Sequence, residues 1–137
     1  MTPEAMATLH ARAFAGTGRA WSAGEITDLL NSPHVFATCA SHGFALTRAV
    51  ADEAELLTIA TDPMHRRQGV ARGLLTRLET EAQARGAGRI FLEVAEDNTT
   101  ATAFYASAGF QQIARRAGYY ERPGQARCDA LILEKPL

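Results

Sequence analysis

Hydrophobic positions recur at two different spacings along this chain, and the change of spacing predicts where helices and strands lie. Apolar residues at helical spacing predict four helices, at residues 3–14, within 21–33, at 69–85 and at 97–109. Short runs rich in apolar and β-branched residues predict six strands, at residues 34–40, 43–50, 54–61, 90–95, 110–116 and 127–137. Short turns separate the first three strands, so we expect an antiparallel meander.

Capping signals mark the ends of three of these helices. Thr2 stands before Pro3, and proline is well placed in the first turn of a helix. Ser22 is followed three residues later by Glu25, which is the spacing of a capping box. Gly86 follows the long third helix, where a residue in the left-handed conformation commonly ends a helix. The succession of strand, long helix and strand around it predicts two parallel neighbouring strands with a right-handed crossover.

Composition indicates a globular protein and excludes several classes. The chain has 137 residues, of which 47% are hydrophobic and 21% charged, and this suits one domain with its own core. Its formal net charge of -1 gives no bulk signal for nucleic-acid binding. We see no signal peptide and no apolar run of the roughly 20 residues that a membrane-spanning helix needs.

The cysteines and histidines predict neither disulfides nor metal ligands. Cys39 and Cys128 lie far apart, which is typical of a reduced, cytoplasmic protein. The histidines are scattered, and no pair has the spacing of metal ligands on a helix: His10, His34, His42 and His65. We therefore expect no metal site.

The segment "HRRQGVARGLL" begins the third predicted helix directly after a strand and a proline turn. The first turn of a helix offers unpaired N–H groups and a partial positive charge, which together bind anions such as a diphosphate. Gly69 and Ala71 are small enough for close approach, while Arg66, Arg67 and Arg72 add charge. The pattern lacks the glycine spacing of a P-loop or of a dinucleotide fingerprint. From these residues alone, a phosphate-binding loop and a solvated basic turn both remain open.

Three polar residues further along have both a chemical and a structural interpretation. Glu93 interrupts an apolar strand, where a carboxylate is costly unless it is paired or used, and burial would make it a better base near neutral pH. Phe104 has the better core spacing, so we expect Tyr105 to point away from the core. Asn98 is either a helix cap or a ligand-binding amide.

Taken together, these motifs resemble the GNAT superfamily of acetyl-CoA-dependent N-acetyltransferases. "R-x-x-G-x-A", from Arg66 to Ala71, is similar to the pyrophosphate loop of that family, and "N-x-x-A-x-x-F-Y-x-x-x-G-F", from Asn98 to Phe110, to its second conserved block. "RRAGYY" followed by "DALILEKPL" looks like the bacterial RimI group, which acetylates the N-terminal alanine of ribosomal protein S18. The resemblance extends from about Asp52 to the C-terminus.

The resemblance implies an α/β (α+β) fold, in which a mixed, mostly antiparallel central sheet is flanked by helices. The first edge strand of such a sheet is short or missing here, because only "MTP" precedes the first predicted helix. We accordingly interpret residues 1–137 as a single acetyltransferase domain.

The resemblance also assigns roles to residues. Glu93 would be the general base and Tyr105 the general acid. Contacts to acetyl-CoA would come from Ile59, Ala60, Thr61, Arg66, Arg67, Gln68, Gly69, Val70, Ala71, Arg72, Asn98 and Tyr105. The acceptor would be bound by Glu55, Leu57, Tyr119 and Tyr120, with the two tyrosines in a polar loop before the last strand.

Acetyl-CoA would then be the co-substrate and a protein N-terminus, that of ribosomal protein S18, the acceptor, with no metal, nucleic acid or membrane involved. Two alternatives stay open at this point. The acceptor could instead be a small-molecule amine, or the chain could bind coenzyme A without catalysis.

Overall fold

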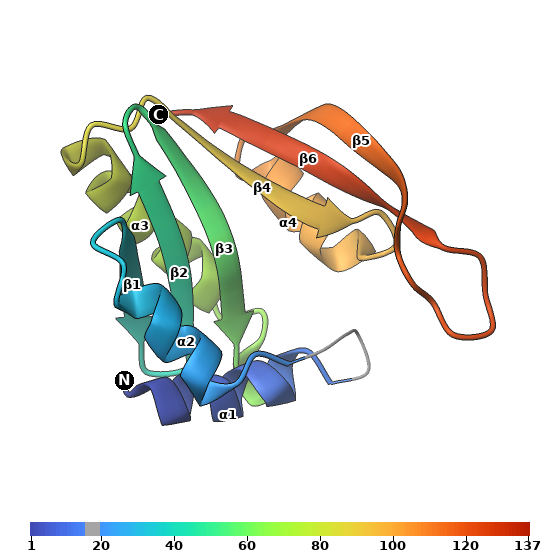
Figure 1. The fold of residues 1–137 in the computed structure, drawn as a ribbon, viewed down its shortest axis with the longest axis horizontal. Coiled ribbons are helices and arrows are strands. Elements are labelled where there is room, and N and C mark those ends of the chain that lie inside the picture. The colour runs from blue at the N-terminus through green and yellow to red at the C-terminus, as the bar shows by residue number, and fades with distance from the viewer. Residues whose placement is uncertain (16–19) are drawn as a thin grey trace.

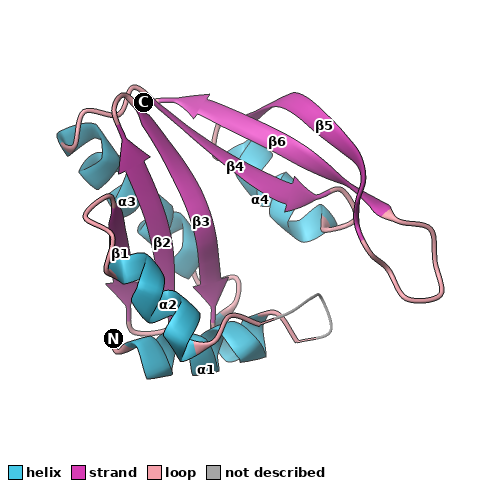
Figure 2. Ribbon diagram, in the orientation of Figure 1, coloured by secondary structure: helices cyan, strands magenta, loops and turns pink. Residues whose placement is uncertain are grey.

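The computed structural model describes residues 1–15 and 20–137, and within them it shows four α-helices around one mixed sheet (Figures 1 and 2). The helices are α1 (Pro3–Ala13), α2 (Ala23–Leu30), α3 (Val70–Ala84) and α4 (Thr99–Ser107). The strands are β1 (Val35–Ala40), β2 (Gly43–Val50), β3 (Glu53–Thr61), β4 (Arg89–Ala95), β5 (Gln111–Tyr120) and β6 (Cys128–Pro136). A short 3-10 helix, η1 (Pro63–His65), follows β3. The element order and the fold class predicted from the sequence are confirmed.

The sheet has the strand order β1-β2-β3-β4-β6-β5, and β3 and β4 are its parallel pair. The first three strands form the predicted antiparallel meander. The crossover from β3 to β4 runs through α3, as the strand–helix–strand succession predicts. β1 and β5 are the two edge strands.

Helices cover the two halves of the sheet differently. α1 and α2 lie on one face of β1–β3 and α3 on the other, whereas α4 lies behind β4 and β6 (Figure 1). The larger core is formed by the sheet with α3 and α4, and it includes Leu78, Ile90 and Phe110. A second core, with Met6 and Ile26, packs α1 and α2 against β2 and β3. Among the residues that the structure describes, no helix covers the front face of β4–β6, and this leaves room for a pocket there.

A β-bulge in β3 changes which face its side chains reach. The register with β2 passes from Leu46↔Thr58 to Thr47↔Leu56, so Leu57 is the extra residue. Before the bulge, Leu56 faces the core on the α3 side; after it, Ala60 faces the core on the α1 side. Simple alternation along the sequence does not reveal this switch.

The predicted helix caps are present. Thr2 accepts a hydrogen bond from the Ala5 N–H, and Ser22 and Glu25 form a complete capping box. Gly86 has φ +95°, the left-handed conformation expected just beyond the end of α3. None of the helices in the described ranges is long and apolar enough to cross a membrane.

The predicted loop before the last strand is shorter than expected, and this corrects the placement of two site residues. Tyr119 and Tyr120 belong to β5, and Tyr120 pairs with Cys128 of β6. The register shifts between Arg116 and Tyr120, and the Asp129 carboxylate accepts a hydrogen bond from the Gly118 N–H at 2.9 Å. The sequence prediction ended the strand early because a glycine and this irregular register interrupt the alternation of residues.

Gly43 generates a prediction about stability. A Cβ atom at this position would lie 2.8 Å from the Ala60 carbonyl oxygen and 2.8 Å from a Val70 methyl carbon. Because backbone cannot yield as a flexible side chain does, we expect Gly43→Ala to lower the free energy of unfolding by about 1–3 kcal/mol. Gly73→Ala is the matched control, because nothing lies within 4 Å of its Cβ and helical alanine should add about 0.5–1 kcal/mol. Urea denaturation would measure both; equal stability of the two variants would contradict the close approach at Gly43.

Candidate active site

β3 and β4 run side by side for only a short distance. Their register consists of Glu53↔Arg89, Ala54↔Ile90 and Glu55↔Phe91, although β3 continues to Thr61 and β4 to Ala95. Figure 1 shows the two strands diverging beyond this point. Within the described residues, the backbone groups of β3 that face β4 after Glu55 therefore have no strand partner. Ile59, Ala60 and Thr61 lie on this segment and pair with β2 on one edge, so only the backbone groups on the other edge are open to a bound molecule.

The loop after η1 leads into the N-terminus of α3. Gly69 is the N-cap residue with φ +78°, and in the part of the chain that the structure describes no side-chain hydrogen bond caps the helix. The N–H groups of Val70, Ala71 and Arg72 are thus first-turn donors directed toward the loop. Nothing lies within 4 Å of a Cβ built at Gly69. An uncapped N-terminus of a helix this long, with open space at its cap, is suited to binding an anion.

Two of the three arginines at the start of α3, Arg66 and Arg72, are held in place by other parts of the chain. The Arg66 guanidinium donates to the Ala13 carbonyl at 3.0 Å, at the end of α1. Arg72 donates to the Ser107 hydroxyl at 2.7 Å and lies over the Phe104 ring at 5.4 Å. Arg67 is exposed and has φ +63°, a conformation that non-glycine residues seldom adopt. These contacts tie the start of α3 to both α1 and α4, so α4 lies close to the loop.

Tyr105, not Phe104, is the core residue of α4, and the expectation from the sequence was wrong on this point. Tyr105 is 7% exposed and packs edge-on against the Phe110 ring at 5.5 Å, whereas Phe104 is half-buried beneath Arg72. α4 is short and its hydrophobic face is weakly defined, so spacing alone could not tell the two rings apart. Burial raises the pKa of Tyr105 to about 12, and its hydroxyl therefore keeps its proton at neutral pH.

Asn98 is the N-cap of α4. Its side-chain oxygen accepts a hydrogen bond from the Ala101 N–H at 3.2 Å. Asn98 therefore caps the helix, and it does so through the oxygen of its side-chain amide. Only the NH₂ group of Asn98 is left as a donor for another molecule.

Glu93 lies on the helix-free face of the sheet, in a pocket of about 340 Å³. The alternation of β4 is as predicted: Phe91 and Glu93 are half-buried on one face, while Leu92 is buried on the other. The Glu93 side chain is 27% exposed, and its carboxylate lies 3.5 Å from Nε of Arg116. The Glu93 carboxylate is thus only partly shielded and stays accessible from the pocket.

The pocket brings together some of the predicted acceptor residues. It is lined by Glu55, Phe91, Leu92, Glu93, Arg116, Tyr119 and Ile132. Leu57 packs instead against the core beneath α1 and α2. Tyr120 is not in the lining, but burial and then the negative charge of Glu93 raise its pKa, so it lies within electrostatic reach. Glu55 and Phe91 form the last register pair of β3 and β4, so the pocket opens where these strands separate.

The sequence reasoning missed Arg116 and Ile132. Ile132 is the cross-strand neighbour of Glu93. Arg116 pairs with Glu93 and also lies over the Tyr119 ring at 5.3 Å. Arg116 belongs to "RRAGYY", the motif already singled out. It stands two positions before a glycine in a strand, and the sequence there does not indicate which face of the sheet its side chain is on. β5 pairs with β6, and β6 pairs with β4; this strand order puts Arg116 on the face of Glu93.

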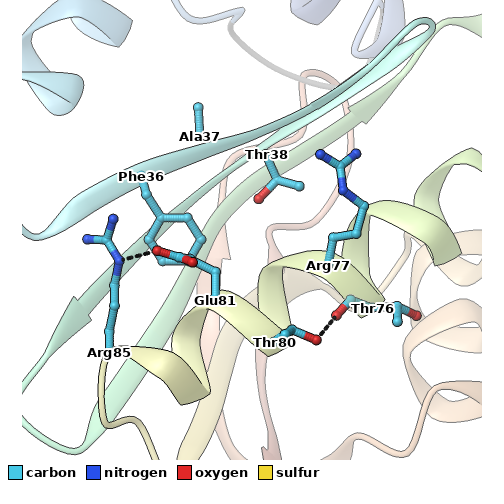
Figure 3. A pocket seen from close by; sticks show the side chains of 8 residues that line it. All are labelled: Phe36, Ala37, Thr38, Thr76, Arg77, Thr80, Glu81 and Arg85. Atoms are coloured by element: carbon cyan, nitrogen blue, oxygen red, sulfur yellow. Dashed lines mark hydrogen bonds and ion pairs between the residues drawn. The ribbon is translucent and has the colours of Figure 1, made fainter.

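Another cavity, of about 510 Å³, lies elsewhere, between β1 and α3 (Figure 3). It contains none of the predicted site residues. It is bordered by Arg77 of α3 and by Arg85, the C-cap residue of that helix. Arg77 donates to the Cys39 carbonyl at 2.7 Å, and Arg85 lies over the Phe36 ring at 4.5 Å. These contacts protect the edge of β1, as charged side chains commonly do at exposed sheet edges.

The chain belongs to the GNAT acetyltransferase family, whose model matches residues 11–110. This confirms the resemblance drawn from the loop and from α4. The chain is 43% identical over 90 residues to the ribosomal protein bS18-alanine N-acetyltransferase of Haemophilus ducreyi, and 43% identical over 94 residues to that of Escherichia coli K12. These alignments cover 66% and 69% of this chain, and the chain thus spans 62% and 63% of the length of the two relatives.

Solved structures agree with this placement. The chain superposes on the crystal structure of the ribosomal-protein-S18-alanine N-acetyltransferase from Escherichia coli with a TM-score of 0.84 and 34% identity, covering 98% of this chain and 86% of that one. Naa20 of Chaetomium thermophilum shares the fold, with a TM-score of 0.83 at 20% identity, covering 100% of this chain and 84% of that one.

The burial of Tyr105 generates a prediction about alkaline stability. Its pKa is about 12 in the folded chain against 10.0 for the unperturbed group, so folding favours the protonated form. The corresponding stabilisation is complete below about pH 10 and is lost as pH rises toward about 12. We expect wild type to lose up to about 3 kcal/mol more than Tyr105→Phe over this range.

Urea denaturation at a series of pH values would measure this difference. Tyr119→Phe is the matched control, because the Tyr119 side chain is exposed and its loss should leave the pH dependence of wild type unchanged. If Tyr105→Phe followed the wild-type curve as well, Tyr105 would not be buried as described.

Proposed function

We propose that this chain transfers an acetyl group from acetyl-CoA to the N-terminal α-amine of a protein. The observation that carries this proposal is the position of Glu93, whose pocket opens where β3 and β4 separate. A carboxylate at that point lies beside the backbone groups that β3 leaves without partners. The names of the bS18-alanine N-acetyltransferases, 43% identical to this chain, support the N-terminal alanine of ribosomal protein S18 as the acceptor.

The residues of this chain fit acetyl-CoA. The uncapped N-terminus of α3, with open space at Gly69, would hold the diphosphate through backbone N–H groups from Arg67 to Arg72. The free backbone of β3 at residues 59–61, together with Asn98, would hold the pantetheine arm. When bound, acetyl-CoA supplies an acetyl thioester, which is activated toward attack by an amine. One N–H of β3 can stabilise the negative charge that develops on the carbonyl oxygen.

Two residues of the chain, Glu93 and Tyr105, would accept and donate the protons of the reaction. The acceptor amine is mainly an ammonium ion near neutral pH, and the Glu93 carboxylate takes its proton directly or through a water molecule. The Tyr105 hydroxyl holds the proton that the departing sulfur needs. No covalent acyl-enzyme is needed, because the amine attacks the thioester directly; the residues that line the pocket do not include Cys39 or Cys128. Amine and sulfur thus exchange the acetyl group while one proton is accepted and another is donated.

Two features of the pocket bear on the acceptor. Nε of Arg116 lies 3.5 Å from Oε1 of Glu93, so an incoming ammonium group would share this carboxylate with Arg116 or displace it. Glu55 is engaged by Arg48 at 3.3 Å and remains 35% exposed. Glu55, Tyr119 and Tyr120 would border the first residues of the acceptor. We further propose that the reaction takes place in the cytoplasm, where both cysteines stay reduced.

A competition between acceptor classes tests the proposed function. The protein is incubated with acetyl-CoA, a panel of peptides with different first residues and a panel of small amines, and products are located by mass spectrometry. We expect acetylation of alanine-first peptides at the α-amine only. Modification of small amines alone would overturn the acceptor, and binding of acetyl-CoA without any product would overturn catalysis.

Glu93→Gln and Tyr105→Phe test the roles of the two residues in the same assay. General acid–base groups contribute about 10²–10⁴-fold to rate, so kcat should fall by a factor in that range in each variant. The affinity for acetyl-CoA should stay close to that of wild type in Glu93→Gln, because that side chain lies on the acceptor side. Cys128→Ala serves as the control and should keep full activity; an undiminished rate in Glu93→Gln would remove it as the base.

Gly69→Val tests the phosphate loop. A β-branched residue at φ +78° is strained and crowds the uncapped helix N-terminus, so acetyl-CoA affinity should fall at least about tenfold. Gly86→Val is the matched control, because Gly86 has φ +95° at the other end of the same helix. It should lose comparable stability yet bind acetyl-CoA as wild type does. Equal affinity in both variants, measured by titration calorimetry, would place the diphosphate elsewhere.

A further inference from the structure

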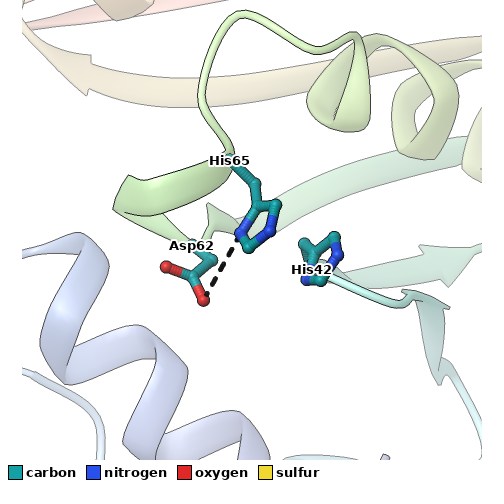
Figure 4. A group of neighbouring side chains, drawn as sticks. All are labelled: His42, Asp62 and His65. Carbon is teal, nitrogen blue, oxygen red and sulfur yellow. Dashed lines mark ion pairs between the residues drawn. The ribbon is translucent and has the colours of Figure 1, made fainter.

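Three side chains with metal-binding groups gather at the end of the sheet where β3 leads into the loop (Figure 4). His42 lies in the turn between β1 and β2, while Asp62 and His65 come from the start and end of η1. One ligand atom from each lies within 4.8 Å of the other two, and all three residues are half-buried. None of them has a role in the proposed acetyl transfer.

The backbone holds this group together. The Asp62 N–H donates to the His42 carbonyl at 2.8 Å, which fixes the turn against the end of β3. Oδ1 of Asp62 accepts hydrogen bonds from the Met64 N–H at 3.0 Å and from Arg12 at 2.8 Å. The second carboxylate oxygen, Oδ2, faces His65. The aspartate is thus anchored through one oxygen and presents the other to the imidazoles.

His65 has a ring nitrogen that the described part of the chain leaves unsatisfied. Its Nδ1 is buried and has no hydrogen-bond partner there. Oδ2 of Asp62 lies 3.8 Å away, too far for a hydrogen bond. Two ligands of one tetrahedral zinc ion lie about 3.3 Å apart, given metal–ligand distances of about 2.0–2.1 Å. The 3.8 Å between Nδ1 of His65 and Oδ2 of Asp62 is therefore closer to the spacing of two ligands of one ion than to the length of a hydrogen bond.

We propose that His42, Asp62 and His65 form a binding site for one divalent transition-metal ion of the zinc class. Two imidazole nitrogens and one carboxylate oxygen would serve as ligands, with water completing a tetrahedron. Imidazole favours zinc, cobalt, nickel and copper, whereas magnesium and calcium prefer all-oxygen sites. The sequence spacing of metal ligands could not reveal this site, because His42 is brought to Asp62 and His65 only by pairing of β2 with β3.

Binding requires one rearrangement. The His42 and His65 rings are stacked, with centroids 3.4 Å apart and planes 6° from parallel. A metal ion lies in the plane of each imidazole that binds it, and two stacked parallel rings cannot both point at one ion. One ring must therefore turn out of the stack, and we assign this movement to His42, which lies in a turn, while the Asp62 carboxylate stays anchored.

The ion would act on the neighbouring loop. His65 directly precedes Arg66, and Gly69 follows three residues later at the start of α3. Fixing the His65 ring to the turn at His42 would restrain the entry to the loop. Because the ion binds only the folded arrangement, it would also raise the thermal midpoint of unfolding.

Titration of tag-free, chelator-treated protein with Zn²⁺ or Co²⁺ tests the site, with acetyl-CoA left out. We expect one ion per chain, visible d–d absorption typical of tetrahedral Co²⁺, and a raised melting temperature with Zn²⁺. Mg²⁺ should give no response. This titration measures no acetyl transfer. A protein that binds no metal would therefore leave the proposed function unaffected, and a protein that transfers no acetyl group would leave the metal site unaffected.

Variants locate the ion. His42→Ala and His65→Ala should each weaken Co²⁺ binding at least about tenfold, while His34→Ala, an exposed histidine outside the cluster, should bind as wild type does. Should either variant fail to fold, paramagnetic broadening of the His42 and His65 ring signals by Co²⁺ in wild-type protein gives the same information. Absence of binding in wild type, unchanged binding in both cluster variants, or broadening confined to other histidines would overturn the site.

Discussion

The separation of β3 from β4 after three register pairs is the constraint on which the rest of the structure depends. In a sheet, backbone N–H and C=O groups normally form hydrogen bonds with the neighbouring strand. Where two strands separate, these groups need another hydrogen-bond partner. Here the two halves remain joined because α3 and α4 share one core behind them. The fold thus keeps a stable back and an open front, and the open front is where the Glu93 pocket and the free backbone of β3 occur.

Charged groups around this opening are already engaged by the chain itself. Glu93 pairs with Arg116, and Arg66 and Arg72 hydrogen-bond to α1 and α4. The ion pair between Glu93 and Arg116 is weak, since ion pairs near the surface are worth about 0–1 kcal/mol. The role of all these contacts is geometric. They hold these side chains near the opening, and a ligand loses little free energy when it breaks the ion pair. Backbone N–H groups at the start of α3, which no side chain caps, remain the fixed donors.

Hydrophobic periodicity was enough to predict the elements, the meander and the parallel pair, because local spacing and capping residues determine them. It failed where tertiary contacts decide. The bulge at Leu57 changes the face reached by β3, and the irregular pairing of β5 brings Tyr119 into the strand. The roles of Glu93 and Tyr105 could be taken from family motifs, which are read along the sequence. The positions of Arg116, His42 and His65 could not, because strand pairing between distant segments decides which residues they meet.

Tyr105 shows why stability and chemistry are coupled in this fold. Its ring fills the core behind the opening, and the same burial that stabilises α4 against the sheet raises the pKa of its hydroxyl to about 12. A phenol with so high a pKa is a weak acid toward most groups, but it holds its proton reliably and donates it best where negative charge develops next to it. A more exposed tyrosine would pack less well against Phe110. The core position that spacing assigned to Phe104 therefore belongs to Tyr105, the residue that we propose as the proton donor.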